Sequence, residues 1–497
     1  MTRTRHNFPL LWLHATGALG KKLLLAAGTL GLSFLPRIWS QTAPAVPNVP
    51  WHSAQERSIE KEAERIVPRE FAVSPTTNYS LAELIDLAEV HNPETHLGWE
   101  RARGRADALG IARSELYPTL AALALSQTSR QQVYLNTRFY RQTIQSFDVA
   151  FDLNYTILDF GGRAGRIDAA RAELLGADFA FNDVHRRVIY QVESGYYQVL
   201  NAVGQEAAAR ANLSNAQAVL QAAEASLKNG LATLPDVLEA RSAAARADYD
   251  LQAALGTEDI ARGNLASALG ASPLHPIPVQ PIDQVSIPDS MEVSVDQAVD
   301  RALQQRPDLM ERVAAIRSAN ARLKEARAAY FPVFRTHVYP DPQSLYGMQE
   351  TLPWGHTAGL DGQITFSLDW MIFDGGARKH RVAEANDNAR AAEAQAAATR
   401  DEIENGVWTA YSNLKTAFRQ REAATALLQA ADQSYSAALE SYHYGVRNLL
   451  DVTDAQRTLA QARSADVLAR TQVLTALAAF AFQTGDAIQP ARQRGQP

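Results

Sequence analysis

Cysteine is absent from this sequence of 497 residues. Its absence excludes disulfide bonds, thiolate catalysis, zinc–thiolate sites and a lipid-modified N-terminal cysteine. An excess of basic residues is absent as well, since the formal net charge is -6, and this argues against nucleic acid as the main partner. With 46% hydrophobic and 21% charged residues, the composition is that of a folded protein.

Hydrophobic runs long enough to cross a membrane as a helix are also missing. The apolar run Leu23–Leu35 has about 13 residues, whereas a transmembrane helix needs about 20. Four basic residues precede this run, and small or polar residues follow it. We therefore predict an export signal peptide over residues 1–42, with a short membrane anchor as the alternative. No other run approaches 18 apolar residues, so we expect any entry into a membrane to occur without transmembrane helices.

What the sequence does contain is an internal repeat. The segment Ile157–Arg163 returns as Ile372–Arg378, 215 positions later, and the same offset relates Gly270 to Gly485. Such self-similarity indicates two copies of one structural unit. We predict a signal peptide (1–42), an extended arm (43–79), a first structural repeat (80–275), a linker (276–293), a second repeat (294–486) and a polar tail (487–497).

Each repeat carries the pattern of a β-hairpin, at about 119–158 and about 333–372. Apolar and aromatic residues alternate with mostly polar or acidic ones over about ten positions, as in a transmembrane β-strand. A half-buried strand of a soluble sheet gives the same alternation and remains the alternative. Polar loops of roughly 20 residues are expected to join the strands of each pair. Turns from strand to helix are predicted at Asp159 and Gly161, and at Asp374 and Gly376.

After these turns the apolar period changes from 2 to 3.5, which indicates coiled coils over about 166–269 and 381–484. No proline interrupts residues 166–229 or 381–444, so each segment predicts one helix of about 63 residues, or roughly 95 Å. A return helix of about 34 residues and the helix of about 23 residues before each hairpin could lie end to end along this long helix. Because the two shorter helices together are nearly as long as the long one, we predict that they form the wall of a tube.

One chain cannot close such a tube. Four amphipathic strands are too few for a barrel, since the smallest barrels have eight. Open strand edges are not tolerated in lipid, because every backbone donor and acceptor there needs a partner. If the hairpins enter a membrane, several chains must contribute them.

This organisation resembles the outer-membrane efflux protein family, the TolC-like channels of Gram-negative bacteria. The resemblance covers almost the whole chain and depends on the strand ends Leu158–Gly162 and Phe373–Gly376 and on the motifs Gly230–Val237 and Gly445–Val452. It implies a mostly α fold with a membrane β-barrel portion. Three chains would form a 12-stranded barrel in the outer membrane that continues into an α-helical periplasmic tunnel.

The resemblance also implies a function and partners. Family members pass drugs, ions or proteins outward, docked to a periplasmic adaptor and to an inner-membrane pump of the RND, ABC or MFS type. They have no catalytic site and bind no cofactor. We therefore expect the exit duct of a tripartite efflux system, in contact with outer-membrane lipid. The alternatives are the duct of a type I protein secretion system and, from another class, a periplasmic coiled-coil scaffold without a channel.

Candidate site residues lie at the tunnel's periplasmic tip. By resemblance, Asp451 and Asp454 form an acidic ring in the pore. Asp236, Tyr442 and Arg447 correspond to a link between neighbouring helices, here called the tip latch. Carboxylates at a narrow pore favour cations. The plainer interpretation is that Asp236 and Asp451 are helix N-caps or acidic residues in the first turn of a helix, beside the positive end of its dipole.

Two glycines are expected at the turns of the tip, and two further patterns do not form the sites that they resemble. Gly230 and Gly445 match the family's turns that contact the adaptor. The glycine-rich segment Gly161–Gly165 lacks the G-x-G spacing of a dinucleotide loop. The 11 histidines include no pair at i, i+4, so no metal site is predicted.

Overall fold

The computed structural model describes residues 56–65, 78–135, 137–274, 277–280, 285–288, 294–350 and 352–486, with the single positions 48, 282 and 290. The chain divides into two compact units, Met1–Arg69 and Glu70–Pro497. In the first unit the described part includes helix α2 (Glu56–Glu64). The predicted signal peptide, most of the predicted arm and the polar tail lie outside the described residues.

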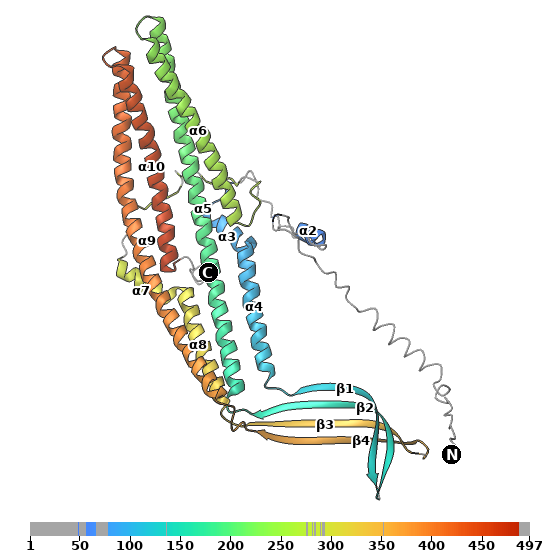
Figure 1. The fold of residues 1–497 in the computed structure, drawn as a ribbon. Helices are drawn as coiled ribbons and strands as arrows, with labels where there is room; N and C mark the ends of the chain where they lie inside the picture. Colours follow the sequence, from blue (N-terminus) through green and yellow to red (C-terminus); the bar gives the residue numbers. More distant parts are fainter. Residues whose placement is uncertain are drawn as a thin grey trace, which may run out of the picture. The chain divides into compact units, whose positions relative to one another are not determined.

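In the second unit, one order of elements occurs twice (Figure 1). A short and a middle helix lead into two strands, which are followed by a long helix and a return helix. The first set is α3 (Leu81–His91), α4 (Pro93–Ser114), β1 (Thr119–Leu135), β2 (Arg138–Leu158), α5 (Gly162–Lys228) and α6 (Leu234–Ala268). The second set is α7 (Val295–Gln305), α8 (Pro307–Ala328), β3 (Val333–Gln349), β4 (Gly355–Asp369), α9 (Ala377–His443) and α10 (Leu449–Thr484).

Local sequence explains where the short helices begin and end. Ser80 caps α3 through a capping box with Glu83, and Ser294 caps α7. Proline occupies the first position of α4 and of α8, where its missing N–H has no consequence. The Asn92 side chain accepts a hydrogen bond from Glu94 N at 2.7 Å and donates one to Ala268 O at 2.8 Å. It thereby joins the start of α4 to the end of α6.

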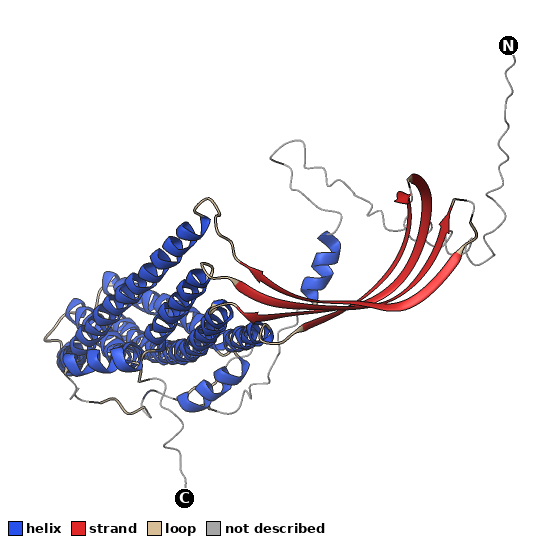
Figure 2. Ribbon diagram, turned by 90° about the horizontal axis from the view of Figure 1, so that it is seen from below, coloured by secondary structure: helices blue, strands red, loops and turns tan. Residues whose placement is uncertain are grey.

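The four strands form one antiparallel sheet in the order β1-β2-β3-β4, curved and twisted as Figure 2 shows. β1 and β2 pair in register from Thr119 opposite Asn154 to Leu135 opposite Arg138. The prediction of polar loops of roughly 20 residues was therefore wrong. The polar residues around Gln131 continue the backbone ladder, because backbone hydrogen bonding in a hairpin does not require apolar side chains.

The long helices α5 and α9 each have 67 residues. The return helix and the middle helix of each repeat both pack along the long one, α6 and α4 along α5, and α10 and α8 along α9. The two repeats meet where α5 packs against α8 and α10, and where β2 pairs with β3. The wall is thus continuous from helices to sheet.

Small residues fill the seams between these helices. Ala216, Ala223, Ala431 and Ala438 are all at most 4% exposed, and in each long helix the two alanines lie seven residues apart, as expected for a heptad seam. Alanine allows close approach of the backbones but buries little apolar area. Within the described residues, α10 is the one helix long and apolar enough to cross a membrane by composition. Several of its apolar residues, such as Val452, Leu459 and Phe480, pack in the helical core.

Candidate functional site

The strand-to-helix turns are built around aspartates. In the first repeat, Asp159 Oδ2 accepts a hydrogen bond from Arg163 N at 2.5 Å, and Arg163 donates to the carbonyls of Glu115 and Ile157, both at 3.2 Å. Gly161 has φ of 101°, a left-handed conformation that glycine adopts without strain. Asp159 therefore stabilises the start of α5, and Arg163 ties this start to the end of α4 and to the end of β2.

The second repeat uses the same chemistry. Asp374 accepts hydrogen bonds from Gly376 N at 3.1 Å and from Arg378 N and Nε, both at 2.9 Å. Burial acts to raise the pKa of Asp374, but the hydrogen bonds from Arg378 outweigh it and lower the pKa. Arg378 also donates to Ile372 O at 3.1 Å, as Arg163 does to Ile157 O. The sequence repeat thus corresponds to a repeated helix start.

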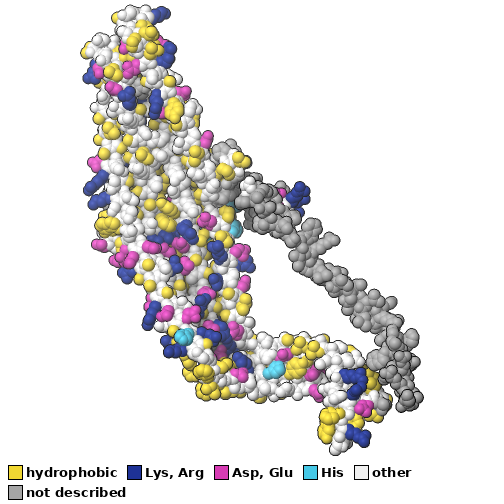
Figure 3. All heavy atoms as spheres, viewed as in Figure 1, with side chains coloured by type: hydrophobic (Ala, Val, Ile, Leu, Met, Phe, Trp, Pro, Cys, Tyr) yellow, Lys and Arg dark blue, Asp and Glu magenta, His cyan; other side chains and the backbone are white. Residues whose placement is uncertain are grey.

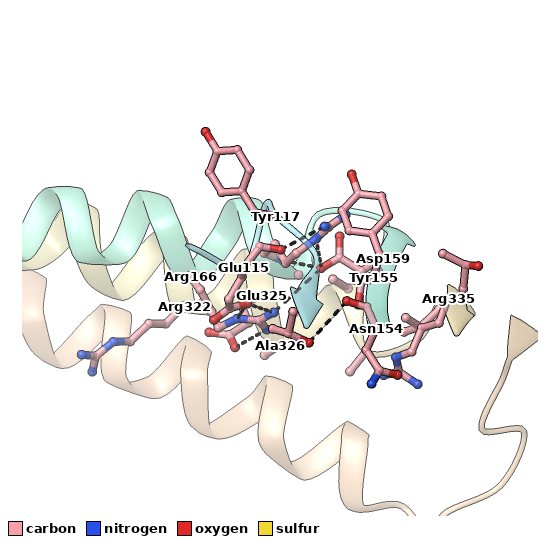
Figure 4. Close-up of a pocket in the computed structure, with 18 of the residues that line it drawn as sticks. Glu115, Tyr117, Asn154, Tyr155, Asp159, Arg166, Arg322, Glu325, Ala326 and Arg335 are labelled. Atoms are coloured by element: carbon pink, nitrogen blue, oxygen red, sulfur yellow. Dashed lines mark hydrogen bonds and ion pairs between the residues drawn. The ribbon is translucent and has the colours of Figure 1, made fainter. Parts of the chain in front are cut away.

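A cavity of about 780 Å³ lies between these turns, at the ends of β2 and β3 (Figure 4). Arg166 donates to Glu115 Oε2 at 2.6 Å and to Glu325 Oε1 at 3.2 Å, and the three side chains point toward one another in Figure 4. Arg335 pairs with Asp369 at 2.9 Å. These ion pairs join α5 to α8 and to the end of α4, and join β3 to β4, next to the place where the helices meet the sheet.

The tips of the two helical hairpins turn on glycine. Gly230 and Gly445 have φ of 73° and 71°, and a Cβ at either would meet nothing within 4 Å. Their backbone N–H groups donate to Leu227 O at 3.0 Å and Tyr442 O at 2.9 Å, in the manner of a Schellman motif. Conformation, rather than space, requires glycine here.

The Asp236 carboxylate binds the start of its own helix, α6. Its carboxylate accepts hydrogen bonds from Thr233 N and Thr233 Oγ1, both at 2.7 Å. The Thr233 side-chain hydroxyl, together with the backbone N–H, lowers the pKa of Asp236. This is the helix-capping role of the plainer interpretation. Within the described part of this single chain, no hydrogen bond or ion pair joins Asp236 to Tyr442 or Arg447.

Asp451 and Asp454, the two aspartates predicted to form an acidic ring, lie in the first turns of α10. Asp451 N donates to Asn448 Oδ1 at 2.9 Å, and the Asp451 side chain is exposed. Asp454 pairs with Arg457 of the same helix at 2.8 Å, and both side chains are more than half exposed. Asp451 therefore carries the less compensated charge at this tip.

A buried polar joint at the middle of the helices was missed by the sequence analysis. Arg186 of α5 is 2% exposed, donates to Phe482 O of α10 at 2.6 Å, and pairs with Asp183 at 2.6 Å. It also lies 3.7 Å from Asp308 of α8, which Arg306 pairs at 2.5 Å. The only signal in the sequence was an arginine on the helix face that otherwise carries apolar residues.

The charges of the neighbouring arginines keep the Asp308 carboxylate of this joint ionised. Burial acts to raise the pKa of Asp308, but hydrogen bonds and charge from Arg306, with the charge of Arg186, lower it overall. Arg306 Nη1 in turn donates to Gln483 Oε1 at 2.7 Å and to the backbone oxygen of Gln483 at 3.3 Å. In the second repeat Arg306 thus joins α8 to α10, as Asn92 joins α4 to α6 in the first.

A second unpredicted residue is Glu193 of α5. Burial raises the pKa of its carboxyl to about 7. Burial also raises the pKa of the neighbouring Tyr197 phenol, with a contribution from the Glu193 charge. Glu193 is therefore partly protonated near neutral pH.

We expect Glu193→Gln to change the pH dependence of stability. The folded state holds this proton more tightly than the unfolded state, so stability falls between about pH 4.5 and 7 and the loss is complete above pH 7. The loss should reach roughly 3 kcal/mol, at about 1.4 kcal/mol per pKa unit. Urea unfolding at pH 5 and pH 8 should show a smaller difference for Glu193→Gln than for the unsubstituted protein. The exposed control Glu224→Gln should leave the difference unchanged, and equal behaviour of the two variants would contradict the assignment.

The sheet presents an apolar surface. Phe151, Ile364, Phe366 and Leu368 are between 41% and 67% exposed. Figure 3 shows hydrophobic side chains gathered where the helices meet the strands. The exposed aromatic and apolar residues at this end include Phe331 (53%), Trp370 (58%), Ile372 (83%) and Phe373 (83%). Aromatic residues next to an apolar band are typical of a membrane boundary.

An amphipathic sheet continuous with helices of 67 residues defines a channel-forming protein of the TolC-like class. The profile of the family described as outer membrane efflux protein matches residues 84–271 and 298–486. The chain belongs to this family, whose members are channels and not enzymes. The membership places it in the Gram-negative outer membrane, with its helices forming a periplasmic extension.

Individual relatives agree with the family. The chain is 28% identical to protein CyaE of Bordetella pertussis, over 82% of this chain and 84% of the relative. It is 25% identical to outer membrane protein OprJ of Pseudomonas aeruginosa, over 89% and 90%. A membrane protein from Pseudomonas aeruginosa of known structure superposes with a TM-score of 0.73, at 23% identity, covering 84% of this chain and 97% of that one. The Vibrio cholerae protein VceC superposes with a TM-score of 0.68, at 17% identity, over 82% and 96%.

Proposed function

We propose that the protein is the passive exit duct of a tripartite efflux system. The observation that carries this proposal is the four-stranded sheet, which is apolar on its exposed face and has unpaired edges at β1 and β4. In lipid such edges must be paired, and three chains joined edge to edge would form a closed 12-stranded barrel. The helices would then form the wall of a periplasmic tunnel.

The periplasmic tip is the proposed gate and docking site. Leu231, Tyr444 and Val446 are between 78% and 83% exposed beside the glycine turns at Gly230 and Gly445. Exposed apolar side chains on a rigid turn suit contact with a periplasmic adaptor protein. An inner-membrane pump of the RND, ABC or MFS type would supply the energy for transport.

The duct is tested by its conductance. Purified protein added to planar lipid bilayers should give discrete single-channel currents, and its migration in detergent gels should change on heating. A protein that inserts but never conducts would reject the duct and favour a coiled-coil scaffold. Crosslinking near Gly230 and Gly445, followed by identification of the captured pump, would distinguish efflux from type I protein secretion.

The acidic ring gives a second prediction. Replacing both Asp451 and Asp454 by asparagine should weaken block of the channel by a trivalent cation about tenfold, because carboxylates repeated around a narrow pore concentrate cations. The exposed pair Asp248 and Asp250 on α6 provides a matched control, whose replacement by asparagine should leave the block unchanged. Equal block in all three proteins would reject the ring.

The tip latch is proposed to form between neighbouring chains. Within one chain the Asp236 carboxylate is bound to Thr233, while Arg447 is exposed. An exposed ion pair contributes at most about 1 kcal/mol, so such a link could yield when an adaptor binds.

A further inference from the structure

The first hairpin extends beyond the second at the end of the sheet farthest from the helices. The ladder between β2 and β3 ends where Gln142 pairs with Gln349. β1 and β2 continue to pair with each other through residues 131–135 and 138–141. These residues form a two-stranded arm, and Figure 1 shows that this end of the hairpin bends away from β3 and β4. A two-stranded hairpin alone is only marginally stable in water, so the arm needs a further partner.

The arm continues the outward, apolar face of the sheet. On β2 the alternate positions Phe147, Val149 and Phe151 are between 41% and 50% exposed, and the alternation runs on to Ile157. At about 3.3 Å per residue and a tilt of about 45°, this band covers about 25 Å, the height of the apolar band in a membrane barrel. The Phe147 ring lies 6.2 Å from the ring of Tyr346 on β3. Aromatic residues at the edge of an apolar band mark the boundary of the membrane, here the outer one.

Beyond this boundary the same face carries arginines. Arg141 lies on the side of β2 that carries Phe147, because residues an even number of positions apart in a strand share a face. Arg130 of β1 pairs opposite Thr143, which places it on that face as the diagonal neighbour of Arg141. Diagonal neighbours across two strands are about 7–8 Å apart. Two flexible guanidinium groups at this separation can bind one anion together.

No carboxylate of the first hairpin compensates these arginines. Residues 116–147 contain Arg130, Arg138 and Arg141 but no aspartate or glutamate, although the net charge of the whole chain is -6. The three side chains are exposed, and none has an ion pair within the described residues. At the end of the second hairpin the acidic residue is Glu350, whose backbone N–H donates to Arg141 O at 2.9 Å. The first hairpin therefore ends in a basic surface that the second hairpin lacks.

The height of this surface indicates what it contacts. With the same rise and tilt, Arg130 and Arg141 lie about 9–14 Å beyond the apolar band. The headgroup region of a phospholipid leaflet is only about 5–8 Å thick, so phosphate groups carried on sugars lie closer to these arginines. The rings of Tyr134 and Phe139, 60% and 68% exposed, lie 5.0 Å apart beside them. Such rings suit the apolar face of a sugar, and arginine binds phosphate through two parallel hydrogen bonds.

We propose that the arm binds a phosphorylated glycolipid of the outer leaflet. Arg130 and Arg141 bind one phosphate group, and Tyr134 and Phe139 pack against the sugar that carries it. The proposal rests on the proposed barrel, which directs the arm to the cell surface, opposite the periplasmic helices. Binding supports the arm, which has no third strand of its own chain beside it.

Glycolipid binding to the full-length protein in detergent tests this assignment. Fluorescent deep-rough lipopolysaccharide should bind the unsubstituted protein more tightly than the same lipid after its phosphates are removed. Arg130→Gln with Arg141→Gln should raise the Kd for the phosphorylated lipid about tenfold or more, because the charge-assisted hydrogen bonds are lost. Arg138→Gln is the matched control. It lies on the opposite face of the same arm and should leave this Kd unchanged.

Folding is followed separately by heat-modifiable migration and single-channel conductance, which neither substitution should change. Conducting channels without a preference for the phosphorylated lipid would overturn the glycolipid site and leave the duct intact. An equal loss of affinity in Arg138→Gln, or equal affinity for phosphatidylglycerol, would also overturn the site. A protein that binds the glycolipid as expected but never conducts would instead reject the duct. The comparison of the two lipids needs no variant, so it decides the question even where a substituted protein does not fold.

Discussion

Arg186→Ala should lower the free energy of unfolding by about 3–5 kcal/mol, because removing one partner of a buried ion pair leaves the others unpaired. The guanidinium lies 4.1 Å from the Phe482 ring centroid, donates to Phe482 O and pairs with Asp183. Its loss would leave the Asp183 and Asp308 carboxylates in a buried site with less compensation. Urea unfolding of the detergent-purified protein, followed by its helical circular dichroism, measures the change.

The adjacent Arg187 provides the control. It pairs with the same Asp183 at 3.1 Å, but its side chain is 51% exposed. Arg187→Ala should therefore cost less than about 1 kcal/mol. Equal midpoints for Arg187→Ala and Arg186→Ala would show that the buried joint does not stabilise the fold in the way described.

Gly165→Leu should cost about 3 kcal/mol or more, because α5 and α8 touch at this residue. A Cβ at Gly165 would lie 2.8 Å from the backbone N of Glu325 and 2.9 Å from its Cα. The backbone atoms of a packed helix cannot move aside as a flexible side chain can. We expect a lower urea midpoint and a smaller fraction of heat-modifiable protein.

Gly110→Leu is the matched substitution. Gly110 also lies inside a helix, α4, but a Cβ there would meet nothing within 4 Å. Leucine has a higher helix propensity than glycine, by up to about 1 kcal/mol, so this variant should be neutral or slightly more stable. A similar loss at both positions would mean that helix approach at Gly165 is not the cause.

Much of the architecture could be predicted from the sequence, because its determinants are local or periodic. Prolines at 93 and 307 mark helix starts, and the heptad alanines that the pattern places in the seams are buried. The strand lengths could not be predicted in the same way. Backbone pairing between strands continues through polar residues such as Gln131, where side-chain alternation gives no signal.

The residues of the candidate site also fall into those that the sequence predicts and those that only the structure reveals. Turn glycines such as Gly445 are evident from the repeat, and the structure places them in left-handed turns. The sequence did not show which carboxylates are already bound by neighbouring groups. Asp236 is held by Thr233, and Asp454 is paired with Arg457, so only the folded helix start reveals which charges are already matched.

The sequence by itself determined that the chain is a duplicated helix–hairpin–helix unit without cysteine, because periodicity, proline positions and an offset of 215 are properties of the linear chain. Only the tertiary structure decided how the two copies are joined. Arg186, Asp308 and Phe482 meet across three helices, and Gly165 meets Glu325, although far apart in sequence. Contacts of this kind depend on which helix faces touch, and the spacing of residues along one helix does not specify its neighbour.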